Sequence, residues 1–193
     1  NGTSLLVQAR DAGDLLHAAQ IGVRLLDGPL ALALDPVPGQ PGSYDGRLQI
    51  SDTRLRNMPA IAALLDGISL VGILDQMNGP GIYFSDVEAD FRLSDDQVVL
   101  RRGSAVGPSM GVSMDGYLDL ARGRLDLQGV LSPIYFLNGI GQLVSRRGEG
   151  LIGFNFTLRG AMSDPQVGVN PLSAFTPGMF RDIFRRPPPR TSR

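Results

Sequence analysis

Apolar and polar side chains alternate with a period of two through most of residues 81–131. Apolar residues occupy positions 87, 89, 91 and 93, and a second long alternation runs from Met110 to Leu120. Asp95-Asp96, Gly107-Pro108 and Arg122-Gly123 separate the runs and are typical of tight turns. The pattern predicts four consecutive antiparallel strands with one apolar and one polar face. Such a sheet must cover its apolar face, so function depends on what covers it.

The flanking segments predict further strands and a few short helices. Alternating apolar residues predict strands at 3–9, 30–34, 44–54, 151–162 and 166–169, the last one after an Asp164-Pro165 turn. Helical spacing or capping residues predict helices at 11–20, 57–75, 135–145 and 178–186. We therefore expect an α+β, β-rich fold, in which a few short helices cover a curved, groove-like antiparallel meander sheet.

The composition supports many short elements and excludes several chemistries. The chain has 193 residues with 25 Gly, 14 Pro and no Cys, so disulfides, thiolate nucleophiles and Cys-based zinc sites are excluded. Its net charge of −1 gives no general attraction to nucleic acid. Aromatic residues make up 6% and Trp is absent, which leaves no stacking platform for single strands.

Residues 58–74 contain one charged side chain, Asp66, which raises the possibility of a membrane span. The stretch is at the short limit for a span and would place Asp66 at mid-bilayer, so a buried covering helix is the better interpretation. The chain begins inside an expected strand without an initiator Met. We expect a piece of a longer protein, with any targeting or membrane segment upstream.

Residues 107–111 match the G-x-S-x-G nucleophile motif at Ser109. That chemistry needs a strand, a sharp turn and a helix, with an acid and a His after the Ser. A strand is expected after Ser109, and the single His of the chain, His17, precedes it. A hairpin turn explains Gly107 and Pro108 better than an esterase does.

The remaining polar groups indicate no catalytic site. Asp86, Glu88 and Asp90 form a row typical of a solvated strand face. One His cannot build a metal site, and Gly139-Ile140-Gly141 lacks the third glycine of a dinucleotide fingerprint. We expect no enzyme activity, no metal and no cofactor.

The last expected helix is amphipathic and is followed by an Arg- and Pro-rich tail. It could contact a membrane surface or an envelope partner, or it could dock as a lid on its own sheet, which its short length favours. The candidate contact residues are Met179, Phe180, Ile183, Phe184, Arg185 and Arg186.

A series of short motifs resembles the C-terminal region of AsmA-like proteins, closest to the YhdP-type branch of Gram-negative envelopes. Order and spacing agree over roughly residues 57–186. The motifs are Gly79-Pro80-Gly81-Ile82-Tyr83-Phe84, Gly107-Pro108-Ser109, Gly116-Tyr117-Leu118-Asp119-Leu120, Leu125-Asp126-Leu127-Gln128-Gly129, Pro133, Asn138, Leu158-Arg159-Gly160, Asp164-Pro165, Asn170-Pro171-Leu172-Ser173 and Pro177-Gly178.

The resemblance implies a periplasmic module of a protein anchored in the inner membrane and built from repeated β-groove units. Such proteins resemble bridge-like lipid transfer proteins, which are thought to carry phospholipid between the inner and outer membranes without catalysis. It also suggests a division of the chain: residues 1–56 end a preceding repeat, 57–186 form the AsmA-like module, and 187–193 form a disordered basic tail.

A lipid groove would use the apolar sheet face, where flexible side chains such as Met and Phe adapt to acyl chains. The alternative is an ordinary α+β core closed by the helices at 57–75 and 135–145, used structurally or to dock an envelope or outer-membrane partner. Sequence does not decide between them. The expected lining residues are Phe91, Leu93, Leu100, Met110, Val112, Met114, Leu118, Leu120, Leu125, Leu127, Phe154, Phe156 and Leu158.

Overall fold

The computed structural model describes residues 2–18, 24–67, 75, 77–133 and 153–170. In chain order the elements are β1 (Leu5–Ala9), α1 (Ala12–Ala18), β2 (Leu25–Leu26), β3 (Leu30–Pro36), β4 (Tyr44–Leu55), α2 (Pro59–Gly67), β5 (Ile82–Leu93), β6 (Gln97–Val106), β7 (Met110–Asp119), β8 (Arg124–Pro133), β9 (Phe154–Ala161) and β10 (Asp164–Asn170). Strands dominate, as the alternating pattern predicts.

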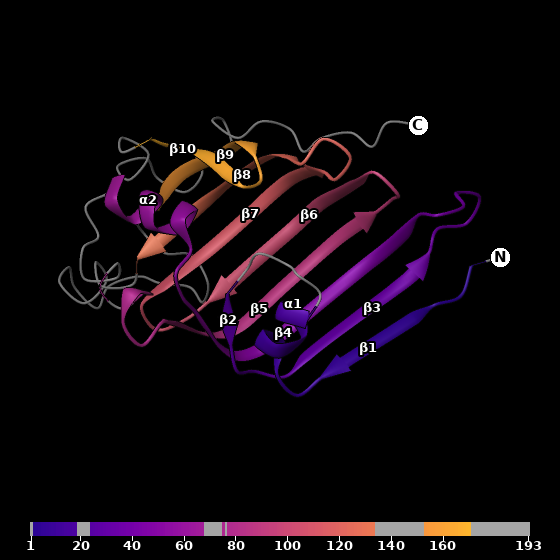
Figure 1. The fold of residues 1–193 in the computed structure, drawn as a ribbon, viewed down its shortest axis with the longest axis horizontal. Helices are drawn as coiled ribbons and strands as arrows, with labels where there is room; N and C mark the ends of the chain where they lie inside the picture. Colours follow the sequence, from indigo (N-terminus) through magenta and orange to yellow (C-terminus); the bar gives the residue numbers. More distant parts are fainter. Residues whose placement is uncertain (1, 19–23, 68–74, 76, 134–152, 171–193) are drawn as a thin grey trace, which may run out of the picture.

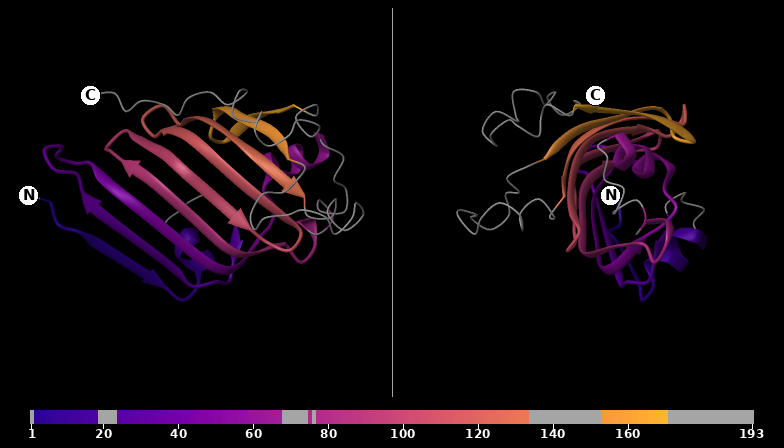
Figure 2. Two further views of the ribbon diagram at one scale, coloured as in Figure 1. Left: turned by 180° about the vertical axis from the view of Figure 1, so that it is seen from behind. Right: turned by 90° about the vertical axis from the view of Figure 1, so that its left-hand side faces the viewer.

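The strands form one antiparallel sheet in the order β1-β3-β4-β5-β6-β7-β8-β9-β10, with the short β2 paired to β4 (Figure 1). Consecutive long strands are neighbours throughout, so β3 to β10 form a meander. The sheet curves into an arc that leaves β1 and β10 as its two edges (Figure 2). The predicted β-rich α+β class with a curved antiparallel sheet and short helices is confirmed.

The two ends of the strands are built differently. At one end the turns between β3 and β4, β5 and β6, β7 and β8, and β9 and β10 join paired strands; we call this the hairpin end. At the opposite end α1 follows β1 and α2 links β4 to β5; we call this the helix end. Both described helices therefore start from the same end of the sheet (Figure 1).

The apolar side chains on the concave face form two clusters. The larger cluster combines Ile61, Leu64 and Leu65 of α2 with buried residues of β5 and of β7 to β9. The smaller one joins Ala12 of α1 to Leu30, Ile50 and their neighbours. The two helices therefore cover different parts of one sheet face. Val87 packs against both clusters.

The four strands expected between residues 81 and 131 are confirmed as β5 to β8, with turns where they were predicted. One turn was predicted wrongly: β10 already begins at Asp164, because Asp164 pairs with Ala161 and the turn lies at residues 162–163. The short β2 was not predicted. Expected helices at 135–145 and 178–186 lie outside the described residues, as does the predicted tail.

The described helices include none that is long and apolar enough to cross a membrane. α2 has nine residues, and residues 68–74 after it lie outside the described ranges. The expected division near residue 56 stays a prediction; β4 and β5, which flank it, pair over eleven residue positions.

Candidate functional site

The concave face carries four rows of apolar residues that cross the sheet, because side chains at paired positions of neighbouring strands share a face. We number the rows from the hairpin end. Row 1 contains Pro36, Tyr44, Leu93, Val98, Leu118, Leu125, Gly160 and Pro165. Row 2 contains Leu5, Leu34, Gly46, Phe91, Leu100, Gly116, Leu127, Leu158 and Val167. Row 3 contains Val7, Leu32, Leu48, Ala89, Gly103, Met114, Gly129, Phe156 and Val169. Row 4 contains Ala9, Leu30, Ile50, Val87, Ala105, Val112, Leu131 and Phe154.

No member of these rows carries a charge, although the chain is 19% charged. Rows 2 and 3 each run across nine strands, from the β1 edge to the β10 edge. A single small core would not need apolar rows that cross the whole sheet. The two helices pack on separate parts of this face, and the rows extend across both parts. The concave face is therefore a continuous apolar surface.

Row 1 at the hairpin end is the row of this surface without a buried member, whereas rows 2 to 4 each combine buried and half-buried residues. All eight members of row 1 are half-buried, whereas Leu131 in row 4 is fully buried. Beyond row 4, Ile82 and Met110 are also fully buried beneath α2. Among the described residues the helix end is thus covered where the helices pack, while the hairpin end keeps its apolar side chains partly accessible.

Two aromatic rings lie flat on cross-strand glycines of this face. A Cβ atom at Gly46 would lie 2.3 Å from two ring carbons of Phe91 on the next strand. A Cβ atom at Gly129 would lie 2.6 Å from the ring of its partner Phe156. Glycine at these positions leaves the space that each ring occupies against the neighbouring strand.

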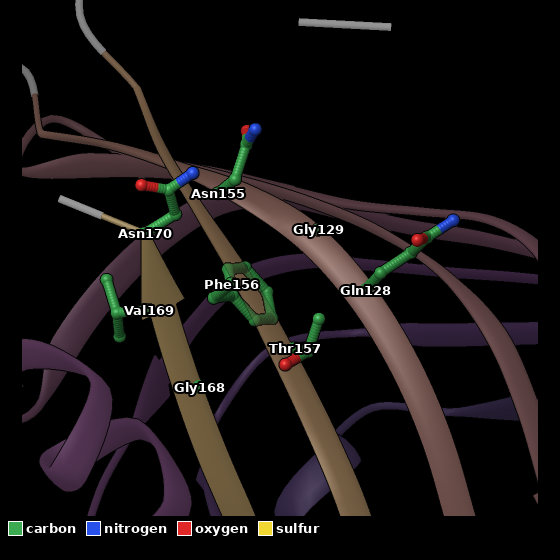
Figure 3. Close-up of a pocket in the computed structure, with 8 residues that line it drawn as sticks. All are labelled: Gln128, Gly129, Asn155, Phe156, Thr157, Gly168, Val169 and Asn170. Atoms are coloured by element: carbon green, nitrogen blue, oxygen red, sulfur yellow. The ribbon is translucent and has the colours of Figure 1, made fainter. Parts of the chain in front are cut away.

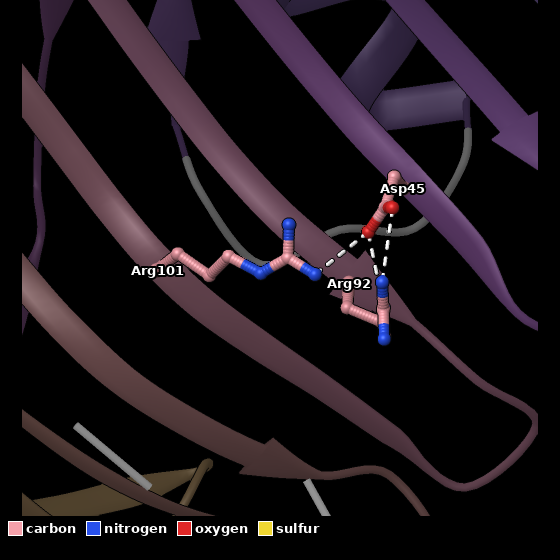
Figure 4. A network of polar contacts seen from close by, with 3 residues as sticks. All are labelled: Asp45, Arg92 and Arg101. Carbon is pink, nitrogen blue, oxygen red and sulfur yellow. Dashed lines mark hydrogen bonds and ion pairs between the residues drawn. The ribbon is translucent and has the colours of Figure 1, made fainter. Parts of the chain in front are cut away.

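The convex face is polar and held by cross-strand ion pairs. Arg92 donates two hydrogen bonds of 3.0 Å to the carboxylate of Asp45, and Arg101 donates a third of 2.8 Å (Figure 4). The bonds from Arg92 are the main reason that the pKa of Asp45 lies below its ordinary value. Beside them, Arg102 contacts Asp90 at 2.7 Å. Charge is thus concentrated on the side opposite the apolar rows.

A β-bulge explains how two consecutive arginines reach the convex face. The register of β6 shifts by one residue between Leu100 and Gly103 against β7, and β6 also shifts against β5. Leu100 and Gly103 both belong to the apolar rows, so Arg101 and Arg102 between them bind acidic residues on the other side. The bulge keeps the apolar rows uninterrupted.

The sheet brings nearly all of the predicted lining residues to the concave face. Leu120 differs, because it lies beyond the end of β7 in a turn and is 45% exposed. The predicted membrane-contact residues at 179–186 lie outside the described residues. The residues that lie on the concave face are Phe91, Leu93, Leu100, Met110, Val112, Met114, Leu118, Leu125, Leu127, Phe154, Phe156 and Leu158.

Sequence reasoning missed the contribution of the first strands. Leu5 and Val7 of β1, Leu32 and Leu34 of β3, and Leu48 of β4 extend rows 2 and 3. The alternation of apolar and polar residues in β1, β3 and β4 indicated that these strands have an apolar face. Only the strand order shows that this face continues the apolar rows of β5 to β10.

Ser109 lies in the turn between β6 and β7, where the backbone N–H of Gly107 donates to the carbonyl of Met110 at 3.0 Å. The element after Ser109 is a strand, so the strand–turn–helix geometry of a nucleophile elbow is not formed there. In the part of the chain that the structure describes, no three potential metal ligands cluster.

A hollow of about 280 Å³ with a mixed polar and apolar lining lies over β8, β9 and β10 (Figure 3). The amide of Gln128 in its wall donates to buried Asp115 at 2.9 Å. None of the residues lining this hollow is titratable, so it offers hydrogen bonding rather than acid–base chemistry. The lining is Gln128, Gly129, Asn155, Phe156, Thr157, Gly168, Val169 and Asn170.

No protein-family model matches the chain, and comparisons with curated proteins and with solved structures find no match. The resemblance to AsmA-like proteins therefore stays a prediction. The concave apolar face is the candidate site that the described residues define.

Proposed function

We propose that the concave face binds the acyl chains of phospholipids as a non-catalytic lipid groove. The observation that carries this proposal is the set of uncharged rows across the sheet, accessible at the hairpin end. An acyl chain makes no hydrogen bonds, so an uncharged face with its polar groups on the opposite side suits it.

The dimensions of the surface are compatible with such a chain. From Leu118 in row 1 to Met114 in row 3 the strand advances about 14 Å, at 3.4 Å per residue. Half the hydrocarbon thickness of a bilayer, the space that one layer of chains occupies, is about 15 Å. Across the sheet, eight strand spacings give about 38 Å, which leaves room for several chains side by side.

The resemblance supports the cellular setting of this proposal. We place the module in the periplasm, as part of a protein anchored in the inner membrane upstream of this chain. There it would take part in phospholipid transport to the outer membrane and in outer-membrane biogenesis.

A charge placed in the groove tests the proposal. Met114 is half-buried in row 3, whereas its neighbour Ser113 is exposed on the convex face. We expect Met114→Asp to weaken binding of a fluorescent phospholipid, because a chain bound over this position would bury an unpaired carboxylate. Ser113→Asp is the matched control and should bind as the parent does. Equal binding by both variants, with folding verified by circular dichroism, would refute the groove.

A docking module without lipid is the second candidate, and the β1 edge favours it. Leu5 and Leu6 are 53% and 64% exposed, and among the described strands β1 pairs only with β3. Its sequence Leu-Leu-Val-Gln-Ala contains no charge or Pro that would discourage strand pairing. If the parent binds no phospholipid but retains an envelope protein through this edge, the docking function replaces the groove.

A further inference from the structure

α2 links two adjacent strands but packs against the far edge of the sheet. It follows β4 and precedes β5, yet its closest sheet contacts are with β10, five positions beyond β5. A Cβ atom at Gly67, the last helical residue, would lie 3.5 Å from Val169 of β10. The helix therefore lies on the inner side of the arc, near its β10 edge (Figure 2).

The residues under α2 form a tightly buried part of the apolar face. Leu64 and Leu65 are fully buried, and they cluster with Met110, Leu131 and Phe156. These contacts come from α2 and from strands β7, β8 and β9, so the helix fills the space above the helix end. An acyl chain that runs along the strands from the hairpin end would meet the packed side chains of this cluster.

The apolar cluster beneath α2 is an unfavourable place for a polar headgroup. Asp66 of α2 is exposed to solvent. Arg54 and Arg56 flank Leu55, which packs in the apolar cluster, and the buried Nε of Arg56 has no hydrogen-bond partner among the described residues. Thr53 is fully buried, but its hydroxyl already donates to a backbone carbonyl of β2 at 3.0 Å. Burying a charged phosphate among the apolar side chains beneath α2 would therefore come at a prohibitive cost.

The hairpin end has the opposite character. Row 1 is half-buried, and the turns just beyond it expose Asp95, Asp96 and Arg122 to water. Arg124 at the start of β8 is also exposed. A headgroup at this end stays hydrated while its chains contact rows 1 to 3.

We propose that α2 is a fixed stop that orients the lipid, with the methyl ends of the acyl chains toward α2 and the headgroup at the hairpin end. This inference rests on the proposed groove function. It makes the groove directional along the strands, so lipid enters and leaves by the hairpin end and not beneath α2.

Position-specific quenching tests the orientation, and the absence of Cys makes single labelling sites simple to introduce. A bimane label is attached at Ala105→Cys in row 4 or at Leu118→Cys in row 1. Val87→Cys replaces the first site if Ala105→Cys fails to fold. The probes are phosphatidylglycerol molecules with a nitroxide near the methyl end or near the headgroup of one chain. Ser113→Cys on the convex face is the control that neither probe should quench.

Rows 1 and 4 are about 20 Å apart along β7, so the two probes should differ by at least about twofold at each site. The methyl-end nitroxide should quench better at position 105, and the headgroup-end nitroxide better at position 118. Equal or reversed quenching at the two sites would overturn the stop while leaving lipid binding intact. No quenching at any groove site would instead remove the groove function itself.

Discussion

Adding one methyl group at Gly46 should destabilise the protein, because the ring of Phe91 occupies that space. The Cβ atom of Gly46→Ala would lie 2.3 Å from two ring carbons, which is well inside van der Waals contact. The ring of Phe91 must therefore move away from position 46. Overpacking of this kind costs about 1–3 kcal/mol. The lower backbone entropy of Ala in the unfolded chain offsets about 0.5–1 kcal/mol of this.

The expected net loss is about 1–2 kcal/mol, which lowers the melting temperature by a few degrees. Gly111→Ala is the matched control on β7, since its added Cβ meets nothing nearer than the carbonyl oxygen of Ala105 at 3.9 Å. That variant should be as stable as the parent or slightly more so. Chemical denaturation monitored by circular dichroism gives both free energies of unfolding.

A double-mutant cycle separates the ring contact from other effects of the methyl group. Phe91→Leu removes the ring, so Gly46→Ala should cost about 1 kcal/mol less in that background than in the parent. If Gly46→Ala is as stable as Gly111→Ala, or costs the same with and without the ring, the ring of Phe91 does not rest on Gly46.

Two further perturbations test the helix that covers the sheet and the ion pairs behind it. Leu64→Ala should cost about 2–5 kcal/mol of unfolding free energy, because Leu64 is fully buried. Asp66 is exposed on the same helix, so Asp66→Ala should change the unfolding free energy little. Equal effects of the two substitutions in thermal melts would contradict the packing of α2. Asp45→Asn should cost about 0.5–1 kcal/mol at neutral pH, because a half-exposed ion-pair network contributes little. Since the folded pKa of Asp45 is lowered, its contribution is present above the unfolded pKa of about 3.9 and disappears as pH falls through the folded pKa. Urea titrations of both proteins at several pH values should therefore converge in strong acid, and a constant difference would contradict the assignment.

Local patterns in the sequence were sufficient to predict the meander and its apolar face. Apolar and polar residues alternate regularly in residues 87–93 and 110–118, and the turns between the strands carry typical turn residues. These two patterns were enough to predict β5 to β8. Most expected lining residues therefore reached the right face. The rows themselves could not be predicted, because they depend on which strands pair and in which register.

The remaining features arise from tertiary packing that leaves little trace in local sequence. The bulge at Arg101 breaks the alternation of β6 by one residue, and Asp52 adopts a positive φ of 52° within β4. Neither residue type signals this by itself. The packing of α2 on β10 joins segments about a hundred residues apart, so helical spacing predicts the helix but not the strand that it covers.

The most direct test of the lipid groove is native mass spectrometry of the protein purified from a bacterial membrane extract. The groove predicts a population carrying the additional mass of bound phospholipid, reduced in Met114→Asp and retained in Ser113→Asp. A parent protein that stays free of lipid, and remains so after incubation with phosphatidylglycerol vesicles, would contradict the central claim.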